Sequence, residues 1–109
     1  MLKDLPRADE ISAFLDGHEF VLDWEEEKCA DYGDEYYISD ADLLINVYND
    51  HKALYKLTTV KNILEYRYKL YIHLVYEQIG DQMMMQNDPY LTADFYVFDD
   101  EDKYLEMIR

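Results

Sequence analysis

Glycine and proline are scarce in this sequence, and this scarcity is the feature that most constrains the fold. The 109 residues include three glycines and two prolines. A domain built only from strands needs many tight turns, and tight turns usually require glycine. Helix should therefore exceed strand. The sequence predicts a helix-rich α+β fold.

The N-terminal stretch "LPRADEISAFLDG", residues 5–17, predicts the first helix. It has a proline near the first turn, early acids, apolar residues on one face and a terminal glycine: Pro6, Asp9, Glu10, Ile11, Phe14, Leu15 and Gly17. These are the usual signals for the start, buried face and end of a helix.

The middle of the chain predicts a central helical hairpin, with helices over about residues 40–57 and 59–79. Ser39 and the acids after it resemble a capping box, and apolar residues from Leu43 to Tyr55 keep a 3.6-residue rhythm. In the second segment, residues 66–76 also alternate with period two, which is typical of a strand. Its length of about twenty residues favours a helix, since strands usually have about five or six residues.

Two shorter regions carry strand signals. "HEFVLDW" (residues 18–24) and "DEYYIS" (residues 34–39) are aromatic and β-branched enough to form a small antiparallel pair. "TADFYVFDDEDKYLEM" (residues 92–107) fits either a hairpin around Asp99–Asp102 or a final helix, and the pattern does not separate the two.

The composition indicates one globular domain spanning residues 1–109. Half of the residues are apolar or aromatic, which argues against disorder. No internal repeat and no linker composition divides the chain. The length is within the range of a single domain.

The net charge of −15, from 25 acids against 10 Lys and Arg, limits the class of partner. A duplex as long as such a domain is wide, roughly 34 Å, would carry about 20 charges. Charge of this sign and size disfavours direct binding to nucleic acid or to an anionic membrane. No stretch approaches a membrane span, and Cys29 has no second cysteine to pair with. We therefore expect a cytoplasmic protein.

Catalytic and metal-binding motifs are not found. There is no glycine-rich phosphate loop, no cysteine pair for zinc and no spacing typical of a catalytic triad. His18 with Asp16 and Glu19 is a weak metal candidate. An EF-hand loop starting at Asp99 would need glycine at its sixth position, where Tyr104 stands. We expect a protein that is not an enzyme and that holds no metal and no cofactor.

Acidic residues are concentrated in residues 20–42 and 81–109, on either side of a nearly neutral stretch. The segment "DWEEEKCADYGDEYYISDAD", residues 23–42, has nine acids with aromatic residues among them. Neighbouring carboxylates on a helix lie about 5–6 Å apart, in the range of successive phosphates. Tyrosine and tryptophan supply low-entropy contacts that dominate interfaces. The predicted partner-binding residues are Asp23, Trp24, Glu25, Glu26, Glu27, Asp31, Tyr32, Asp34, Glu35, Tyr36, Tyr37, Asp99, Asp100, Glu101 and Asp102.

With its small size, its acidity and the segments "DWEEEKCADYGDEYYISDAD" and "DDED", the chain resembles the phage-encoded inhibitors that mimic DNA. These include anti-CRISPR proteins, restriction inhibitors and uracil-DNA glycosylase inhibitors. The resemblance is one of composition. It implies a non-catalytic inhibitor that binds a basic, nucleic-acid-processing protein inside the host cell.

Other function classes fit the same composition. An immunity protein or antitoxin would neutralise a basic nuclease toxin through a similar acidic, aromatic face. An acidic phage protein without an inhibitory role is a further alternative, and an enzyme is another. The sequence is also compatible with a homodimer.

Overall fold

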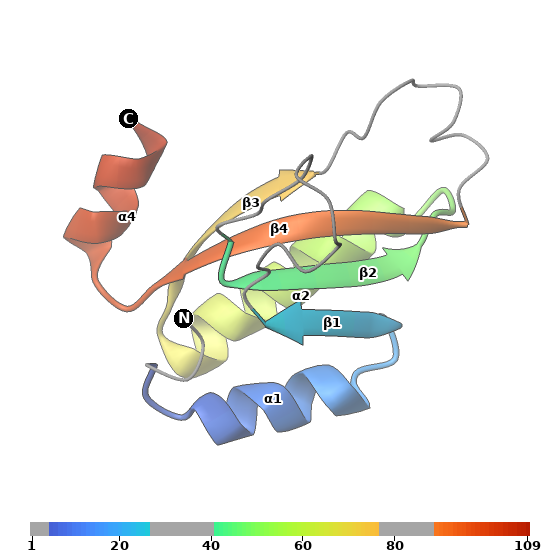
Figure 1. Cartoon of the computed structure of the whole chain (residues 1–109), viewed down its shortest axis with the longest axis horizontal. Coiled ribbons are helices and arrows are strands. Elements are labelled where there is room, and N and C mark those ends of the chain that lie inside the picture. The colour runs from blue at the N-terminus through green and yellow to red at the C-terminus, as the bar shows by residue number, and fades with distance from the viewer. Residues whose placement is uncertain (1–4, 27–40, 77–88) are drawn as a thin grey trace, which may run out of the picture.

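The structure, a computed structural model, describes residues 5–26, 41–76 and 89–109 (Figure 1). In chain order its elements are α1 (Ala8–Gly17), β1 (Asp23–Glu26), β2 (Leu43–Tyr48), α2 (Ala53–Tyr68), β3 (Tyr71–Tyr76), β4 (Tyr90–Phe98) and α4 (Glu101–Ile108). About 43% of these described residues are helical and 32% are in strands. The α+β class is confirmed, but the prediction that the fold is helix-rich is wrong, because a four-stranded antiparallel sheet makes up about a third of the described residues.

The four strands form one antiparallel sheet in the order β1-β2-β4-β3. The chain passes from β2 through α2 to β3, and β4 then inserts between those two strands. This is a split β-α-β arrangement. Within the described residues, β1 and β3 are consequently the two edges of the sheet.

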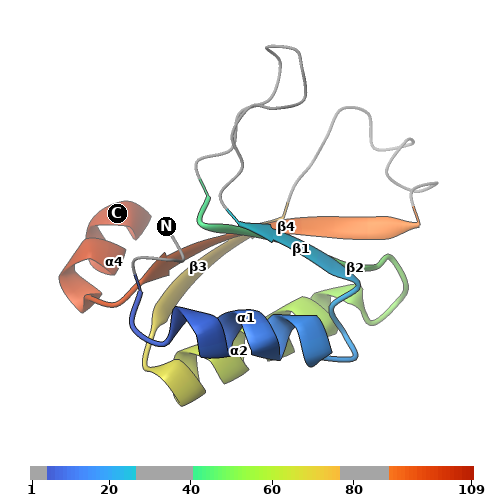
Figure 2. The ribbon, with the colours of Figure 1, turned by 60° about the horizontal axis from the view of Figure 1, so that its bottom comes forward.

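Helices α1 and α2 lie together on one face of the sheet (Figure 2). Side chains that alternate along the strands turn toward them, as the pleat requires. The buried cluster is formed by Ile11 and Leu15 of α1, Ala53, Leu57, Val60 and Leu64 of α2, Leu70, and the strand residues Leu43, Ile45, Val47, Ile72, Leu91, Ala93, Phe95 and Val97. The core therefore fills the space between the two helices and one face of the sheet.

The opposite face of the sheet is rich in aromatic and acidic side chains, and we refer to it as the aromatic face. By strand register it carries Asp23, Glu25, Leu44, Asn46, Tyr48, Tyr71, His73, Val75, Tyr90, Thr92, Asp94, Tyr96 and Phe98. Helix α4 packs over one end of this face, where the ring of Tyr104 lies 5.9 Å from that of Tyr71 and 6.2 Å from that of Phe98. Among the described helices, α1 and α2 contribute nothing to it.

The predicted central helical hairpin is wrong. The first of its two segments, residues 40–57, contains strand β2 and only the start of α2. In β2, Leu43, Leu44, Ile45 and Val47 are all buried. A strand that is buried on both faces has a continuous apolar sequence. Hydrophobic periodicity alone cannot distinguish such a sequence from a buried helix. The pair Asn49-Asp50, which forms the turn into α2, was the signal against one long helix.

The second helix of that hairpin is also wrong in extent. Helix α2 ends at Tyr68, and Lys69 adopts the left-handed conformation with φ 56° while its N–H bonds to the carbonyl of Glu65. This position usually holds glycine or asparagine, so a lysine there hides the helix end in the sequence. The period-two alternative holds for Tyr71–Tyr76, which form β3.

The remaining predictions have mixed outcomes. The first helix is confirmed as α1, with Ile11 and Leu15 buried. "HEFVLDW" contributes part of β1, which pairs with β2, while "DEYYIS" and Ser39 lie outside the described residues. Residues 92–107 continue β4 to Phe98 and then form α4, so each alternative was half right.

Candidate binding surface

Part of the predicted acidic site lies on edge strand β1. Asp23 and Glu25 are exposed and belong to the aromatic face, whereas Trp24 and Glu26 alternate with them and are partly buried. The other predicted residues of this segment lie outside the described residues: Glu27, Asp31, Tyr32, Asp34, Glu35, Tyr36 and Tyr37.

Trp24 has a structural role in addition to any binding role. Its ring packs against the buried core, and its indole Nε1–H donates to Asp16 Oδ1 at 2.7 Å. An indole N–H that is partly buried needs such a partner. Trp24 therefore anchors edge strand β1 to helix α1.

The second predicted group, Asp99–Asp102, lies at the junction of β4 and α4, and all four residues are exposed. Asp100 is the N-cap of α4, where its Oδ1 accepts a hydrogen bond from the backbone N–H of Asp102 at 2.8 Å. Glu101 and Asp102 stand in the first turn, where negative charge is favoured by the helix dipole. These acids therefore help to start α4.

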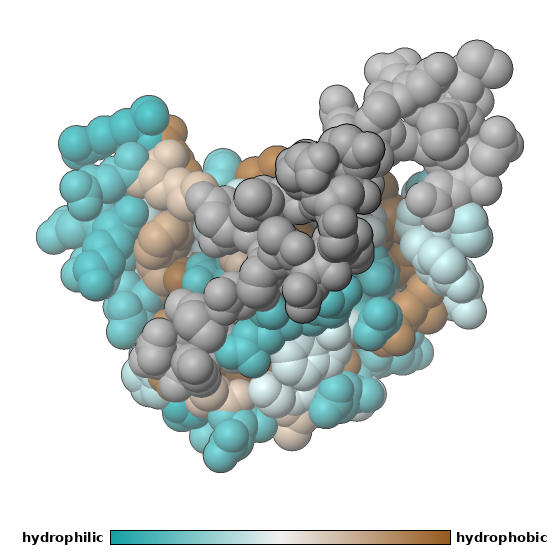
Figure 3. Space-filling view, in the orientation of Figure 1, coloured by the Kyte–Doolittle hydropathy of each residue, from teal (hydrophilic) through white to brown (hydrophobic). Residues whose placement is uncertain are grey.

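The structure does not bring the two described acidic groups together. Strand β1 is one edge of the sheet, whereas α4 packs against β3 and β4 toward the other edge (Figure 1). Hydrophilic side chains cover the outer surface of α4 in Figure 3. The acids are thus distributed over two sides of the described part of the molecule.

Basic residues gather on and beside α2. Lys56, Lys61 and Arg67 lie within the helix, and Lys52 and Lys69 flank it. The helix contains a single acid, Glu65, which pairs with Lys61 at 3.0 Å. Helix α2 lies on the face opposite the aromatic face, so the helix that carries these basic residues is on the other side of the sheet from Asp23 and Glu25.

Two exposed tyrosines stand beside the acids of β1. Tyr48 of β2 and Tyr90 of β4 are register partners, and their rings stack with centroids 6.1 Å apart and an angle of 28°. Their exposed fractions are 54% and 49%, which is high for such large side chains. Together with Leu22, Asp23 and Asn46 they line a hollow of about 400 Å³.

A lysine already lies against this tyrosine pair. The Nζ atom of Lys56 is 5.8 Å from the ring centroid of Tyr48 and 5.9 Å from that of Phe20. It also bonds to Asp50 Oδ2 at 2.9 Å. The pKa of Asp50 is lowered by this hydrogen bond from Lys56 and by a second one from the backbone N–H of Lys52.

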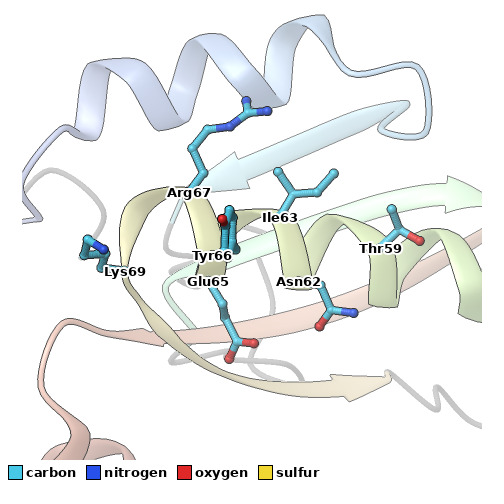
Figure 4. A pocket seen from close by; sticks show the side chains of 7 residues that line it. All are labelled: Thr59, Asn62, Ile63, Glu65, Tyr66, Arg67 and Lys69. Atoms are coloured by element: carbon cyan, nitrogen blue, oxygen red, sulfur yellow. The ribbon is translucent and has the colours of Figure 1, made fainter.

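A larger hollow of about 830 Å³ lies along the second half of α2 (Figure 4). It is lined by Thr59, Asn62, Ile63, Glu65, Tyr66, Arg67 and Lys69. Glu65 accepts hydrogen bonds from Lys61 and from the backbone N–H of Ile72, and the Arg67 guanidinium lies 5.2 Å from the Phe14 ring. Its charged groups thus stabilise the fold. Size alone does not make this hollow the functional site.

No protein-family model, no curated protein and no solved structure matches this chain. Within residues 5–26, 41–76 and 89–109, no group of three or more His, Cys, Asp or Glu side chains is arranged to hold a metal ion. In the same residues, no helix has both the length and the apolar character needed to cross a bilayer.

Sequence reasoning missed Asn46, Tyr48 and Tyr90. The signal was present in "YLTADFYVF", where apolar Leu91, Ala93, Phe95 and Val97 alternate with polar or aromatic residues. This alternation is the mark of a strand with one buried face. In β2 the same signal is hidden by Leu44, which is buried on the aromatic face.

Proposed function

We propose that this protein is a non-catalytic inhibitor that binds a basic, nucleic-acid-processing protein, such as a CRISPR effector or another host defence nuclease. Its acidic, tyrosine-bearing surface takes the place of nucleic-acid phosphates. One observation carries the proposal: Asp23 and Glu25 share a sheet face with the exposed pair Tyr48 and Tyr90.

The geometry of β1 supports a phosphate-like spacing of charge. Residues two apart on a strand point to the same face and lie about 6.6–6.8 Å apart, in the range of successive phosphates. Asp23 and Glu25 are such a pair. Trp24 and Glu26 point to the other face, so they do not lie between the two carboxylates. The carboxylates of β1 therefore have the spacing of an extended strand, and not the helical spacing expected from the sequence.

The rest of the molecule supports binding to a basic partner. The net charge of −15 would steer such a partner from a distance and raise the association rate. Exposed tyrosines next to the carboxylates supply contact area at low entropic cost. Such a protein acts in the cytoplasm of the host cell, where Cys29 stays reduced.

The proposal is tested in bacteria that carry an active CRISPR or restriction system. Expression of the protein should restore phage plating on the protected strain. The charge-neutralised variant Asp23→Asn/Glu25→Gln should reduce that protection at least tenfold. The matched control Asp9→Asn/Glu19→Gln removes the same charge from exposed positions in and after α1 and should leave it unchanged.

Two results would contradict the proposal. One is that both double variants act like the parent, which would exclude the acids of β1. The other is that the protein relieves no defence system in a panel, but neutralises a basic nuclease toxin encoded in its neighbourhood. The second result would favour an immunity protein.

A further inference from the structure

We propose that the hollow between Tyr48, Tyr90 and Asp23 receives one arginine or lysine side chain of the partner. This inference rests on the proposed function, because it assumes a basic target. It goes further by naming the residues that hold the cation and the chemical class of the group they hold.

The walls of the hollow come from three adjacent strands. Asp23 is the register partner of Asn46, and Tyr48 is that of Tyr90. Leu22 closes the β1 side, where its N–H donates to the carbonyl of Asn46 at 3.0 Å. The floor is thus a hydrogen-bonded sheet, which positions the side chains above it more firmly than a loop does.

The carboxylate of Asp23 is held in place. Its Oδ1 accepts a hydrogen bond from the backbone N–H of Trp24 at 2.9 Å. The second oxygen, Oδ2, makes no hydrogen bond or ion pair with the described residues and serves as the acceptor for an incoming cation. Asn46 is held in turn, because its Oδ1 bonds to the Thr92 hydroxyl.

The tyrosine rings supply the second element of cation recognition. An ammonium or guanidinium group within about 6 Å of an aromatic centroid is attracted by the ring, and a guanidinium also stacks on it. The molecule already uses this contact, since Lys56 lies 5.8 Å from the Tyr48 ring. The charge of Lys56 is balanced by Asp50 at 2.9 Å, so it does not dominate the field in the hollow.

The hollow has room for one long side chain. About 400 Å³ is near the lower end of the roughly 300–1,000 Å³ found for small-molecule sites. It suits one long side chain whose apolar stem lies along Leu22 and whose head reaches Asp23. Arginine fits best, because it combines a stacking plane with several donors.

The test uses the full-length, isotope-labelled protein and two small probes. N-acetyl-arginine methylamide carries the guanidinium, and N-acetyl-citrulline methylamide is its uncharged isostere. NMR spectra of the aromatic rings and of the backbone amides would follow each titration. The arginine probe should shift the ring signals of Tyr48 and Tyr90 and the amides near Asp23, and citrulline should bind at least several-fold more weakly.

Two variants keep the test independent of folding. Asp23→Asn preserves an acceptor for the Trp24 N–H and should weaken arginine binding about two- to five-fold, the range of an exposed ion pair. Tyr90→Leu should weaken it to a similar extent. The control Glu106→Gln, at an exposed position of α4, should leave it unchanged. Shifts centred elsewhere, equal binding of citrulline, or unchanged affinity in both variants would overturn the proposal.

The outcome is separable from that of the proposed function. If arginine binds in the hollow but no basic target is inhibited, the proposed function fails and the cation site stands. If arginine does not bind there while Asp23→Asn/Glu25→Gln still loses inhibition, the cation site fails and the acidic surface stands.

Discussion

The two faces of the sheet are made by the same four strands, yet they have opposite character. Toward α1 and α2, Ile45, Val47, Ile72 and Phe95 are completely buried. On the aromatic face, Tyr48 and Tyr90 keep about half of their surface exposed. Alternation along a strand allows this separation, because neighbouring residues point to opposite sides. The comparison indicates that the face toward the helices stabilises the fold, whereas the aromatic face keeps exposed side chains where Tyr48 and Tyr90 lie.

The largest expected effect compares Phe95 with Tyr90, both on β4. Phe95→Ala removes a fully buried ring and should lower the free energy of unfolding by about 3–5 kcal/mol. Tyr90→Ala removes a half-exposed ring that stacks on Tyr48 and should cost less than about 1.5 kcal/mol. Urea unfolding followed by circular dichroism measures both. Similar losses for the two variants would mean that the aromatic face is part of the core.

A second prediction separates structural acids from surface acids within the acidic stretch 23–42. The Oδ2 atom of Asp42 accepts a hydrogen bond from the N–H of Val97, which is almost completely buried, at 2.7 Å. Asp42→Ala leaves that donor without its partner and should cost about 1–3 kcal/mol. Glu25→Ala, at an exposed position of edge strand β1, should cost less than Asp42→Ala does. Equal unfolding midpoints for these two variants in urea would show that Asp42 is no more structural than Glu25.

A third, smaller effect concerns the cap of α4. Asp100→Ala should lower stability by about 1 kcal/mol, since it removes the hydrogen bond to the Asp102 N–H. Asp100→Asn keeps the cap and removes the charge, so the free energy of unfolding should change by only a few tenths of a kcal/mol. If Asp100→Asn nevertheless reduces inhibition in cells, Asp100 binds the partner as well as capping the helix. Equal destabilisation by Ala and Asn would show that charge, and not capping, is what matters there.

The smallest effect is a dependence on pH. The hydrogen bonds from Lys56 and Lys52 lower the pKa of Asp50 below its ordinary value of 3.8, so Asp50 stabilises the folded state when ionised. This contribution is fully present above that value and is lost as the pH falls through the lower pKa of the folded state. Between pH 5 and pH 2, unfolding midpoints should therefore fall more steeply for the parent than for Asp50→Asn. Parallel pH profiles would show that the pair with Lys56 contributes nothing, as exposed ion pairs often do.

The sequence predicted the α+β class. It also predicted the first helix, because the start, the apolar face and the terminal glycine of α1 all appear in the sequence. It failed where two signals conflicted. Strand β2 is apolar on both faces at Leu43 and Leu44, and α2 ends at a lysine where glycine is usual. Strand β2 is buried on both faces because it lies between β1 and β4 under the helices. The end of α2 depends on the left-handed backbone of Lys69, which that residue type does not indicate.

The candidate site was predictable only in part. Acidity and aromatic content pointed to Asp23 and Glu25, which the structure places on the aromatic face. The tyrosines beside them come from strands distant in sequence, so only the register of β2 and β4 brings Tyr48 and Tyr90 together. Trp24 anchors β1 to α1 and Asp100 caps α4, and both roles depend on hydrogen bonds that local sequence patterns do not reveal.

The most direct test of the central claim is a competition experiment with the proposed target, a basic nucleic-acid-processing protein. If the acidic, tyrosine-bearing face replaces nucleic acid, excess cognate DNA or RNA should displace the protein, and Asp23→Asn/Glu25→Gln should be displaced more easily. Affinity should also fall as salt rises from 50 to 200 mM, by up to about 10³, since protein carboxylates carry fewer condensed counterions than DNA does. The account is contradicted if the target holds this protein and its nucleic acid at the same time with neither affinity changed.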